Sequence, residues 1–161
     1  MDIGVHALDL CMFLMGFPKP VSVTGTSRVN FAKGRVIPGA WGEWNRKLYS
    51  VEDFATGFVR FDDGSTLMLE ASWLGHYNVP ECMKCQIYGK KASLEWPSGE
   101  FSTARDRVLQ DGKLSPVKGL MPPHTAELFA FYDCVVNNKP SPVPVEETIK
   151  VIGILEGIYK S

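Results

Sequence analysis

The sequence predicts an α+β fold: an open, predominantly antiparallel sheet with helices on one face. Apolar residues recur with a helical period at both ends of the chain and alternate with period two between them. Short turn sequences such as Asp62-Asp63-Gly64 separate the alternating runs. Strands joined by short turns pair antiparallel, and helices gathered at the chain ends can cover one face of such a sheet.

Length and composition are those of one globular domain spanning residues 1–161. The net charge of -1 and the absence of a basic run exclude a nucleic-acid or acidic-membrane partner. The apolar start is too short and too interrupted to span a bilayer and has no basic leader, so a cytoplasmic location is expected. Reduced thiols are expected at the four scattered cysteines, Cys11, Cys82, Cys85 and Cys134.

The first element is a helix from Met1 to Gly16 that is apolar around most of its circumference, as in a helix buried on most sides. Its exceptions are Asp2, His6 and Asp9, whose spacing places them in one polar stripe. A buried, unpaired carboxylate costs several kcal/mol, so this stripe must face a cleft, a partner group or its own members. Because the chain opens inside such a helix, without a cap or entry loop, we expect a fragment of a longer protein.

A strand follows at Val21–Val29, with Val21, Val23 and Gly25 expected on one face. The stretch 30–49 is irregular and carries Trp41 and Trp44. A long loop with two tryptophans is typical of a binding loop or lid. The alternative is that both rings only cover a sheet edge.

Three hairpins are expected next. Phe54–Phe61 and Ser65–Trp73 are joined at the Asp-Gly turn, one of the strongest short-range hairpin signals. The second pairs 83–88 with 92–96 across Gly89-Lys90-Lys91. A third, weaker pair joins 100–109 to 114–117 through Asp111-Gly112.

Two helices close the chain. One runs from an N-cap at Thr125 to Asn137-Asn138, and the other covers Val145–Lys160, with Glu146 and Glu147 in its first turn and Lys160 in its last. Because all helices are expected on one side of the sheet, the other side needs either water-tolerant residues or a second copy of the protein. A homodimer through the open sheet face is therefore expected.

Most common site chemistries have no candidate. The sequence contains no G-x-G-x-x-G, no Walker pattern and no nucleophile elbow. Cys82 and Cys85 match C-x-x-C, with His76 as a conceivable third ligand. Residues three apart on a strand face opposite sides, however, so no metal site is expected. His124 is expected in a loop before a helix.

The polar stripe of the first helix has two interpretations. In the first, Asp2 is an N-cap or first-turn acid and His6 is a hydrogen-bonded core histidine. In the second, Asp2 and His6 form an acid/base pair in which the carboxylate orients the imidazole.

The stretch Asp2-Ile3-Gly4-Val5-His6-Ala7-Leu8-Asp9 resembles the D-x-G-x-H-x-x-D helix of a family of NAD(P)-dependent dehydrogenases. This is the glucose-fructose oxidoreductase / inositol dehydrogenase / MocA-like (Gfo/Idh/MocA) family. Later landmarks resemble the family's C-terminal domain in order: Val51-Glu52-Asp53-Phe54-Ala55, Phe61-Asp62-Asp63-Gly64, Glu70-Ala71-Ser72-Trp73, Ile87-Tyr88-Gly89 and the helix 146–161. The resemblance implies a dihydrodipicolinate-reductase-like domain that binds substrate and forms oligomer contacts, without the Rossmann domain.

The resemblance also implies roles. His6 accepts the proton of a sugar or polyol hydroxyl as hydride leaves for NAD or NADP, and Asp2 orients substrate or imidazole. The family's Glu-Lys-Pro lysine and dinucleotide fingerprint are absent, so this chain by itself is expected to bind no nicotinamide cofactor and to be inactive. Weaker substrate-binding candidates are Asp9, Trp41, Trp44 and Trp73.

Two other functions stay open from the sequence. A free-standing binding or scaffolding module could keep this fold without its chemistry. A small hydrolase or isomerase could use Asp2 and His6 as a dyad, in which case His6→Ala abolishes an activity of this chain.

Overall fold

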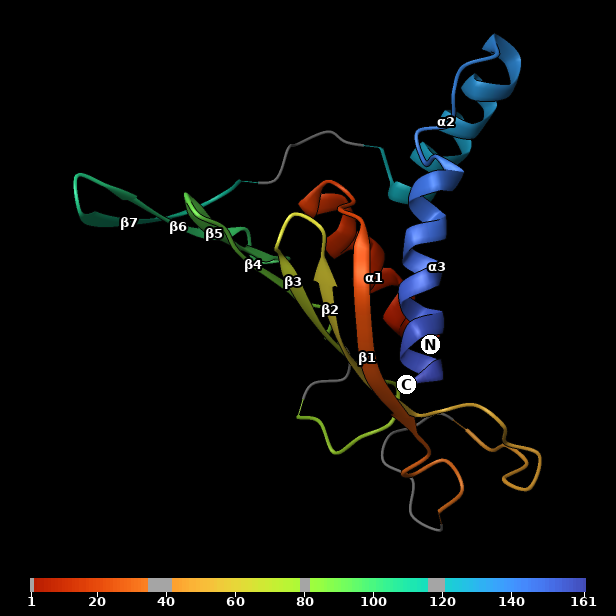
Figure 1. Cartoon of the computed structure of the whole chain (residues 1–161). Helices are drawn as coiled ribbons and strands as arrows, with labels where there is room; N and C mark the ends of the chain where they lie inside the picture. Colours follow the sequence, from red (N-terminus) through yellow and green to blue (C-terminus); the bar gives the residue numbers. More distant parts are fainter. Residues whose placement is uncertain (1, 35–41, 79–81, 116–120) are drawn as a thin grey trace. The chain divides into compact units, whose positions relative to one another are not determined.

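The computed structural model describes residues 2–34, 42–78, 82–115 and 121–161. The chain forms two compact units, Met1–Met83 with Ile149–Ser161, and Lys84–Thr148. The first unit contains α1 (Asp2–Met15), β1 (Pro20–Arg28), β2 (Phe54–Phe61), β3 (Thr66–Ser72) and most of α3 (Val145–Lys160) (Figure 1). The second contains β4 (Cys85–Tyr88), β5 (Ala92–Trp96), β6 (Glu100–Arg105), β7 (Val108–Lys113) and α2 (Pro123–Asn137). The α+β class with antiparallel strands is confirmed.

The strands form two hydrogen-bonded antiparallel sheets, one in each unit. Their orders are β1-β2-β3 and β4-β5-β6-β7, so every strand pairs with its neighbours in sequence. This order confirms the expected hairpin at 54–72. There, Gly64 adopts φ 83° and the Asp63 carboxylate accepts the Ser65 N–H at 2.8 Å. The hairpin over β4 and β5 is confirmed as well.

The core of the first unit lies between the β1-β2-β3 sheet and the helices α1 and α3. Both helices lie on the same side of this sheet in Figure 1. Every second residue of β2 and β3 points into this core, as the alternation in the sequence predicts. The buried core side chains are Leu8, Met12, Phe17, Val59, Phe61, Leu67, Leu69, Val151, Ile154, Leu155 and Ile158.

The burial expected for α1 is wrong. Only Gly4, Leu8 and Met12 are buried, one residue per turn on a single stripe, while Ile3, Phe13 and Leu14 are exposed. Composition alone cannot distinguish this arrangement from an enclosed helix, because the same apolar residues fit both. The first unit covers α1 on one side only, so the opposite side faces outward.

The predicted end of α1 at Gly16 is confirmed. Gly16 has φ 78° and Phe17 φ 51°, and their N–H groups donate to the carbonyls of Phe13 (3.1 Å) and Met12 (2.8 Å). This is the Schellman pattern that satisfies the last carbonyls of a helix. The Lys150 Nζ of α3 donates to the Phe17 carbonyl at 2.5 Å and so ties the two helices together at this end.

In the first strand, Val21 does not lie on the face of the sheet expected for it. A β-bulge lies between Pro20 and Ser22, so Val21 has no partner in the register and is 57% exposed. Val21 therefore does not share a face with Val23 and Gly25. A bulge shifts the alternation by one residue, and the residue pattern carries no signal for it.

Two glycines allow α3 to approach the sheet closely. Gly25 and Gly57 are direct partners across β1 and β2, and Ile158 lies over both. A Cβ on Gly57 would lie 2.5 Å from Ile158 Cδ1, and one on Gly25 would lie 2.7 Å from Ile158 Cγ2. The absence of these two side chains creates the depression into which Ile158 packs.

The third hairpin is placed wrongly by the sequence. Its turn is Asp106-Arg107, with φ 51° and 66°, whereas Asp111-Gly112 lies within β7. Gly112 pairs with Phe101, and a Cβ on Gly112 would lie 2.4 Å from the Phe101 ring. An aromatic ring that covers a cross-strand glycine is a known way of fixing register. The contact across the strands therefore outweighs the Asp-Gly turn preference.

Helix α2 begins two residues before the expected N-cap Thr125. Its first residue is Pro123, which suits a first helical position because its missing N–H is not needed there. The helix ends as predicted, with Asn138 left-handed at φ 49°. None of its residues is buried.

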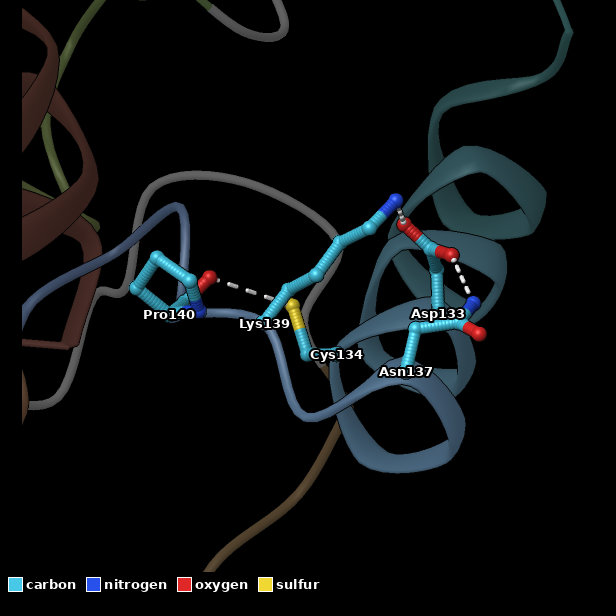
Figure 2. A network of polar contacts seen from close by, with 5 residues as sticks. All are labelled: Asp133, Cys134, Asn137, Lys139 and Pro140. Atoms are coloured by element: carbon cyan, nitrogen blue, oxygen red, sulfur yellow. Dashed lines mark hydrogen bonds and ion pairs between the residues drawn. The ribbon is translucent and has the colours of Figure 1, made fainter.

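A polar network fixes the end of α2 (Figure 2). The Asp133 carboxylate accepts hydrogen bonds from Asn137 Nδ2 at 2.6 Å and Lys139 Nζ at 2.8 Å. The Cys134 thiol donates to the Pro140 carbonyl at 3.4 Å. The hydrogen bonds from Lys139 and Asn137 lower the pKa of Asp133, so the carboxylate that holds this turn is ionised at neutral pH.

The close approach of α3 gives a stability prediction. Gly25→Ala is expected to destabilise the protein by about 1 to 3 kcal/mol, because overpacking forces neighbouring atoms apart. Its Cβ would lie 2.6 Å from the Thr56 carbonyl oxygen, a backbone atom that cannot rotate away. Urea denaturation followed by circular dichroism measures the change.

The matched control is Gly153→Ala, a glycine of α3 itself. A Cβ there meets nothing within 4 Å, and alanine stabilises an exposed helix interior by about 0.5–1 kcal/mol. Equal effects of the two substitutions would contradict the proposed packing of α3.

Candidate active site

The polar stripe of α1 faces outward. Asp2, His6 and Asp9 are all exposed, and their spacing puts them along one side of the helix. His6 is therefore not a buried core histidine, and the interpretation of a hydrogen-bonded core residue is wrong. An exposed imidazole one turn from a carboxylate can accept a proton from a ligand bound alongside the helix.

A cavity of about 320 Å³ adjoins the first turn of α1. Its walls come from that turn, from the segment before β2, and from the end of β3. The lining residues are Asp2, Ile3, Gly4, Val51, Glu52, Asp53, Ala55, Ala71, Ser72 and Trp73. The structure thus brings together Asp2 and Trp73, two residues predicted for the site, although 71 positions separate them in the chain. His6 and Asp9 do not line this cavity.

Asp53 fixes the backbone around the cavity. Its side chain is 1% exposed, and its carboxylate accepts three backbone N–H groups at 2.7 Å, from Asn30, Phe31 and Ala32. The buried charge is thereby compensated by hydrogen bonds, as burial requires. Asp53 therefore holds the start of the long loop after β1 against the start of β2.

The backbone of Asp53 extends the same connection to β3. The Asp53 carbonyl accepts hydrogen bonds from the Ser72 hydroxyl at 2.9 Å and from the Trp73 backbone N–H at 3.3 Å. The Asp53 backbone N–H donates to the Arg28 backbone carbonyl at 3.0 Å. Three strand ends are thus joined at one residue. Trp73 leaves β3 in a direction set by these bonds.

An aromatic cluster supports the cavity wall. The Trp73 ring is stacked with Tyr49 at 6.0 Å and 27°, and lies 5.4 Å from Trp44. Trp73 Nε1 donates to the Tyr49 hydroxyl (3.1 Å) and the Glu52 carbonyl (3.2 Å), while Trp44 Nε1 donates to Ala32 (2.9 Å). Trp44 is half-buried and holds Trp73 from outside the cavity lining. Trp41 lies outside the described residues.

Glu52 adds a second carboxylate to the cavity. Partial burial raises the pKa of this carboxyl, hydrogen bonds to it lower the pKa by more, and the net shift is downward. One of those bonds comes from the Tyr159 hydroxyl at 2.7 Å. Burial, together with this carboxylate, raises the pKa of Tyr159 to about 12. Tyr159 therefore stays protonated and keeps donating to Glu52 throughout the physiological range.

Sequence reasoning missed Glu52, Asp53 and Ser72 as site residues. The available signal was an acidic pair directly before a buried strand, which is an unusual place for two carboxylates. Their roles depend on which loops lie opposite them, and the local sequence does not specify this.

The cysteines show no metal-binding arrangement. Cys82 is exposed and Cys85 buried, and all four cysteines, which lie in described ranges, are thiols. Across the described part of the chain, no three His, Cys, Asp or Glu side chains come together as metal ligands. His76 instead lies edge-on to Phe31 at 5.5 Å.

The residues present do not fit a dinucleotide. A nicotinamide cofactor needs a glycine-rich turn leading from a strand into a helix, and the sequence contains no such turn. The cavity at α1 also offers no cationic side chain among its described lining residues. No chemical step through such a cofactor can be assigned to this chain.

Comparisons with known proteins agree with this architecture. The family model described as "Oxidoreductase family, C-terminal alpha/beta domain" (Gfo/Idh/MocA) matches residues 1–161. The chain therefore belongs to the Gfo/Idh/MocA oxidoreductase family and corresponds to its C-terminal domain. The resemblance found in the sequence is confirmed.

Among curated proteins, a D-glucoside 3-dehydrogenase of Escherichia coli is 36% identical over 118 residues, which are 68% of this chain and 33% of the relative. Among solved structures, aldose-aldose oxidoreductase from Caulobacter crescentus in complex with glycerol has a TM-score of 0.69 at 16% identity, covering 98% of this chain and 43% of that one. An oxidoreductase from Agrobacterium radiobacter, in complex with NAD+, L-tartaric acid and magnesium, has a TM-score of 0.63 at 18% identity over 99% and 45% of the two chains. The chain thus spans about a third of the curated relative's length.

Asp53 supplies the prediction for this site. Asp53→Asn is expected to destabilise the protein by about 2 to 4 kcal/mol, because it removes the charge and turns a donor toward buried N–H groups. The midpoint of urea unfolding, followed by tryptophan fluorescence, measures the loss. Asp9→Asn, on the exposed stripe, is the control and is expected to leave the midpoint unchanged. A shift as small as that of the control would contradict the central role of Asp53.

Proposed function

We propose that this chain is the substrate-binding and oligomerisation domain of an NAD(P)-dependent dehydrogenase. Its substrate is a sugar, a polyol or a related small molecule, and the enzyme oxidises one hydroxyl group of that substrate. Family membership supports the oxidoreductase class, and the D-glucoside dehydrogenase supports a sugar substrate. The observation that carries the proposal is the exposed Asp2 and His6 pair, one helical turn apart on α1 and beside a cavity lined by Asp2.

His6 acts as the general base in this proposal. Oxidation of an alcohol to a carbonyl releases the hydroxyl proton, which a neutral imidazole accepts near neutral pH. Asp2 orients the substrate or the ring, because it lies one turn before His6 and lines the cavity. Asp9 extends the same face by a further turn and can hold a second hydroxyl.

The cofactor, NAD or NADP, belongs to a longer parent in this proposal. The curated relative is about three times as long as the matched region, which leaves room for a dinucleotide-binding domain. This chain by itself is therefore proposed neither to bind a nicotinamide cofactor nor to turn over substrate. Within the described ranges, none of the helices combines the length and apolar character needed to cross a membrane. The exposed Cys82 thiol supports a reducing, cytoplasmic location.

The open face of the β1-β2-β3 sheet is the proposed dimer contact. Phe58 and Met68 are paired across β2 and β3 and are 42% and 85% exposed. Arg60 lies to one side of this pair and Glu70 to the other. A two-fold axis across the strands brings Arg60 of one copy beside Glu70 of the second and places the apolar pairs in contact.

The catalytic proposal is tested in the longer parent that carries this domain. His6→Gln is expected to lower kcat by about 10²–10⁴, because the variant loses its general base. The matched control is His124→Gln, whose side chain is fully exposed on α2 and which should retain parental kcat. Equal activity of the two variants, measured by NADH or NADPH absorbance, would refute the role of His6.

The dimer proposal is tested by Met68→Glu, which places a charge at the centre of the apolar pair. In analytical ultracentrifugation, the variant is expected to sediment as a monomer where the wild-type chain sediments as a dimer. The dimer dissociation constant is expected to rise at least tenfold, a loss of about 1.4 kcal/mol of association free energy. Thr66→Glu, at the margin of the same face, is expected to have a smaller effect. A wild-type chain that sediments as a monomer would overturn the proposed contact.

A further inference from the structure

Two turns of the β4-β5-β6-β7 sheet lie at the same end of that sheet. One is Gly89-Lys90-Lys91, between β4 and β5, and the other is Asp106-Arg107, between β6 and β7. When antiparallel strands pair in sequence order, every second turn falls at the same end of the sheet. The Thr103 hydroxyl of β6 donates to the Lys91 carbonyl at 2.9 Å. This bond fixes the first turn against the hairpin that carries the second.

This end of the sheet carries a cluster of positive charge. Its cations, all of them exposed, are Lys90, Lys91, Arg105 and Arg107, and we call these four residues the basic tip. Asp106 lies 3.8 Å from Arg105 Nε, with both side chains largely in water. Within the described part of the chain, the other three cations make no ion pair. Four cations and one acid give this end a net charge of +3.

The second turn holds an arginine in a backbone conformation that favours glycine. Arg105 pairs with Val108, so Asp106 and Arg107 form a two-residue loop, with φ 51° and 66°. Such loops prefer Asn-Gly or Asp-Gly, because both central residues need a positive φ. Side chains kept at strained backbone positions cluster at functional sites. The needs of the turn therefore do not account for Arg107.

The surroundings of the basic tip restrict the shape of an anionic partner. Val108 and Leu109, which follow the turn, are 61% and 75% exposed and point to opposite faces of β7. Further from the turns, Glu95, Glu100 and Asp111 line one hollowed face of the same sheet. These acids repel a nucleic acid or a flat anionic membrane that extends beyond the tip, because like charges in an interface are costly. A partner that covers only the tip avoids them.

The spacing of the cations matches an extended polypeptide. Neighbouring strands lie about 4.8 Å apart, so the two turns, which are centred two strands apart, are separated by about 10 Å. An extended chain advances about 3.3 Å per residue, so about four residues reach from one turn to the other. Arginine binds carboxylates through two parallel hydrogen bonds, and lysine attracts them as a point charge. A short run of acidic residues fits both.

We propose that the basic tip binds an extended acidic segment of a partner protein. Carboxylates of the segment pair with Arg105 and Arg107 at one turn. Further carboxylates pair with Lys90 and Lys91 at the other turn, and an aliphatic side chain of the segment packs on Val108. This surface is separate from the dehydrogenase site, because none of these residues belongs to α1 or lines the cavity beside it.

Fluorescence anisotropy on the 161-residue chain tests this proposal. The probe is a rhodamine-labelled peptide, Gly-Glu-Glu-Val-Glu-Glu-Gly. It is expected to bind, with an affinity that falls as sodium chloride is added, because salt screens exposed charges over about 8 Å at physiological ionic strength. A matched peptide with glutamine in place of glutamate is expected not to bind. Equal binding of the two peptides would overturn the proposal.

Variants locate the binding surface. Arg107→Gly removes one charge and suits the turn, because glycine adopts a positive φ without steric cost. It is expected to weaken peptide binding about two- to fivefold, as for an exposed ion pair, without lowering the urea midpoint. The matched control is Lys113→Gln, at the far end of β7, which should keep the wild-type affinity. Adding Lys90→Gln, Lys91→Gln and Arg105→Gln to Arg107→Gly is expected to abolish binding.

The remaining outcomes each contradict the proposal. If the wild-type chain does not bind the acidic peptide, the basic tip is not a docking site for it. If the fourfold variant is folded by circular dichroism and binds as tightly as wild type, the peptide uses a different surface. If single-stranded oligothymidylate or phosphatidylserine vesicles bind more tightly than the peptide, and the fourfold variant loses that binding, the partner is a nucleic acid or a membrane.

Discussion

The buried Asp53 carboxylate is the constraint on which the site depends. It is charged, nearly inaccessible to water, and stabilised by three backbone N–H groups from a loop more than twenty residues away. A buried charge of this kind is tolerated only if its hydrogen bonds form together. The loop after β1 and the ends of β2 and β3 must therefore adopt one arrangement. Trp73 and Glu52 take their places at the cavity through that arrangement.

The packing of α3 provides the second constraint. Because Gly25 and Gly57 lack side chains, Ile158 reaches the sheet backbone, and the end of α3 is fixed over β1 and β2. One residue further on, Tyr159 donates to Glu52. The packing of the core and the position of a charged group in the cavity are thus coupled through adjacent residues of one helix. A change in either glycine is expected to be felt at Glu52.

The proposed chemistry of the domain depends on the two faces of α1, one buried in the core and one exposed. The helix buries one narrow stripe in the core and presents Asp2, His6 and Asp9 on its exposed surface. In the proposed function, the base and the sugar-binding cavity come from this chain and the hydride acceptor comes from elsewhere in the longer parent. Such a division places the reacting carbon at a surface of this domain. It accounts for an acid/base pair that is exposed here.

The sequence by itself determined the α+β class, the two stronger hairpins, the end of α1 and the spacing of Asp2 and His6. These features follow from local periodicity and turn chemistry, which are properties of short stretches of sequence. Only the tertiary structure decided the bulge at Val21, the turn at Asp106-Arg107, and the meeting of Asp2, Glu52 and Trp73 in one cavity. The bulge and the cavity depend on contacts between segments distant in the chain, and the turn depends on the pairing of Phe101 with Gly112 across one hairpin; a pattern of neighbouring residues does not specify any of these contacts.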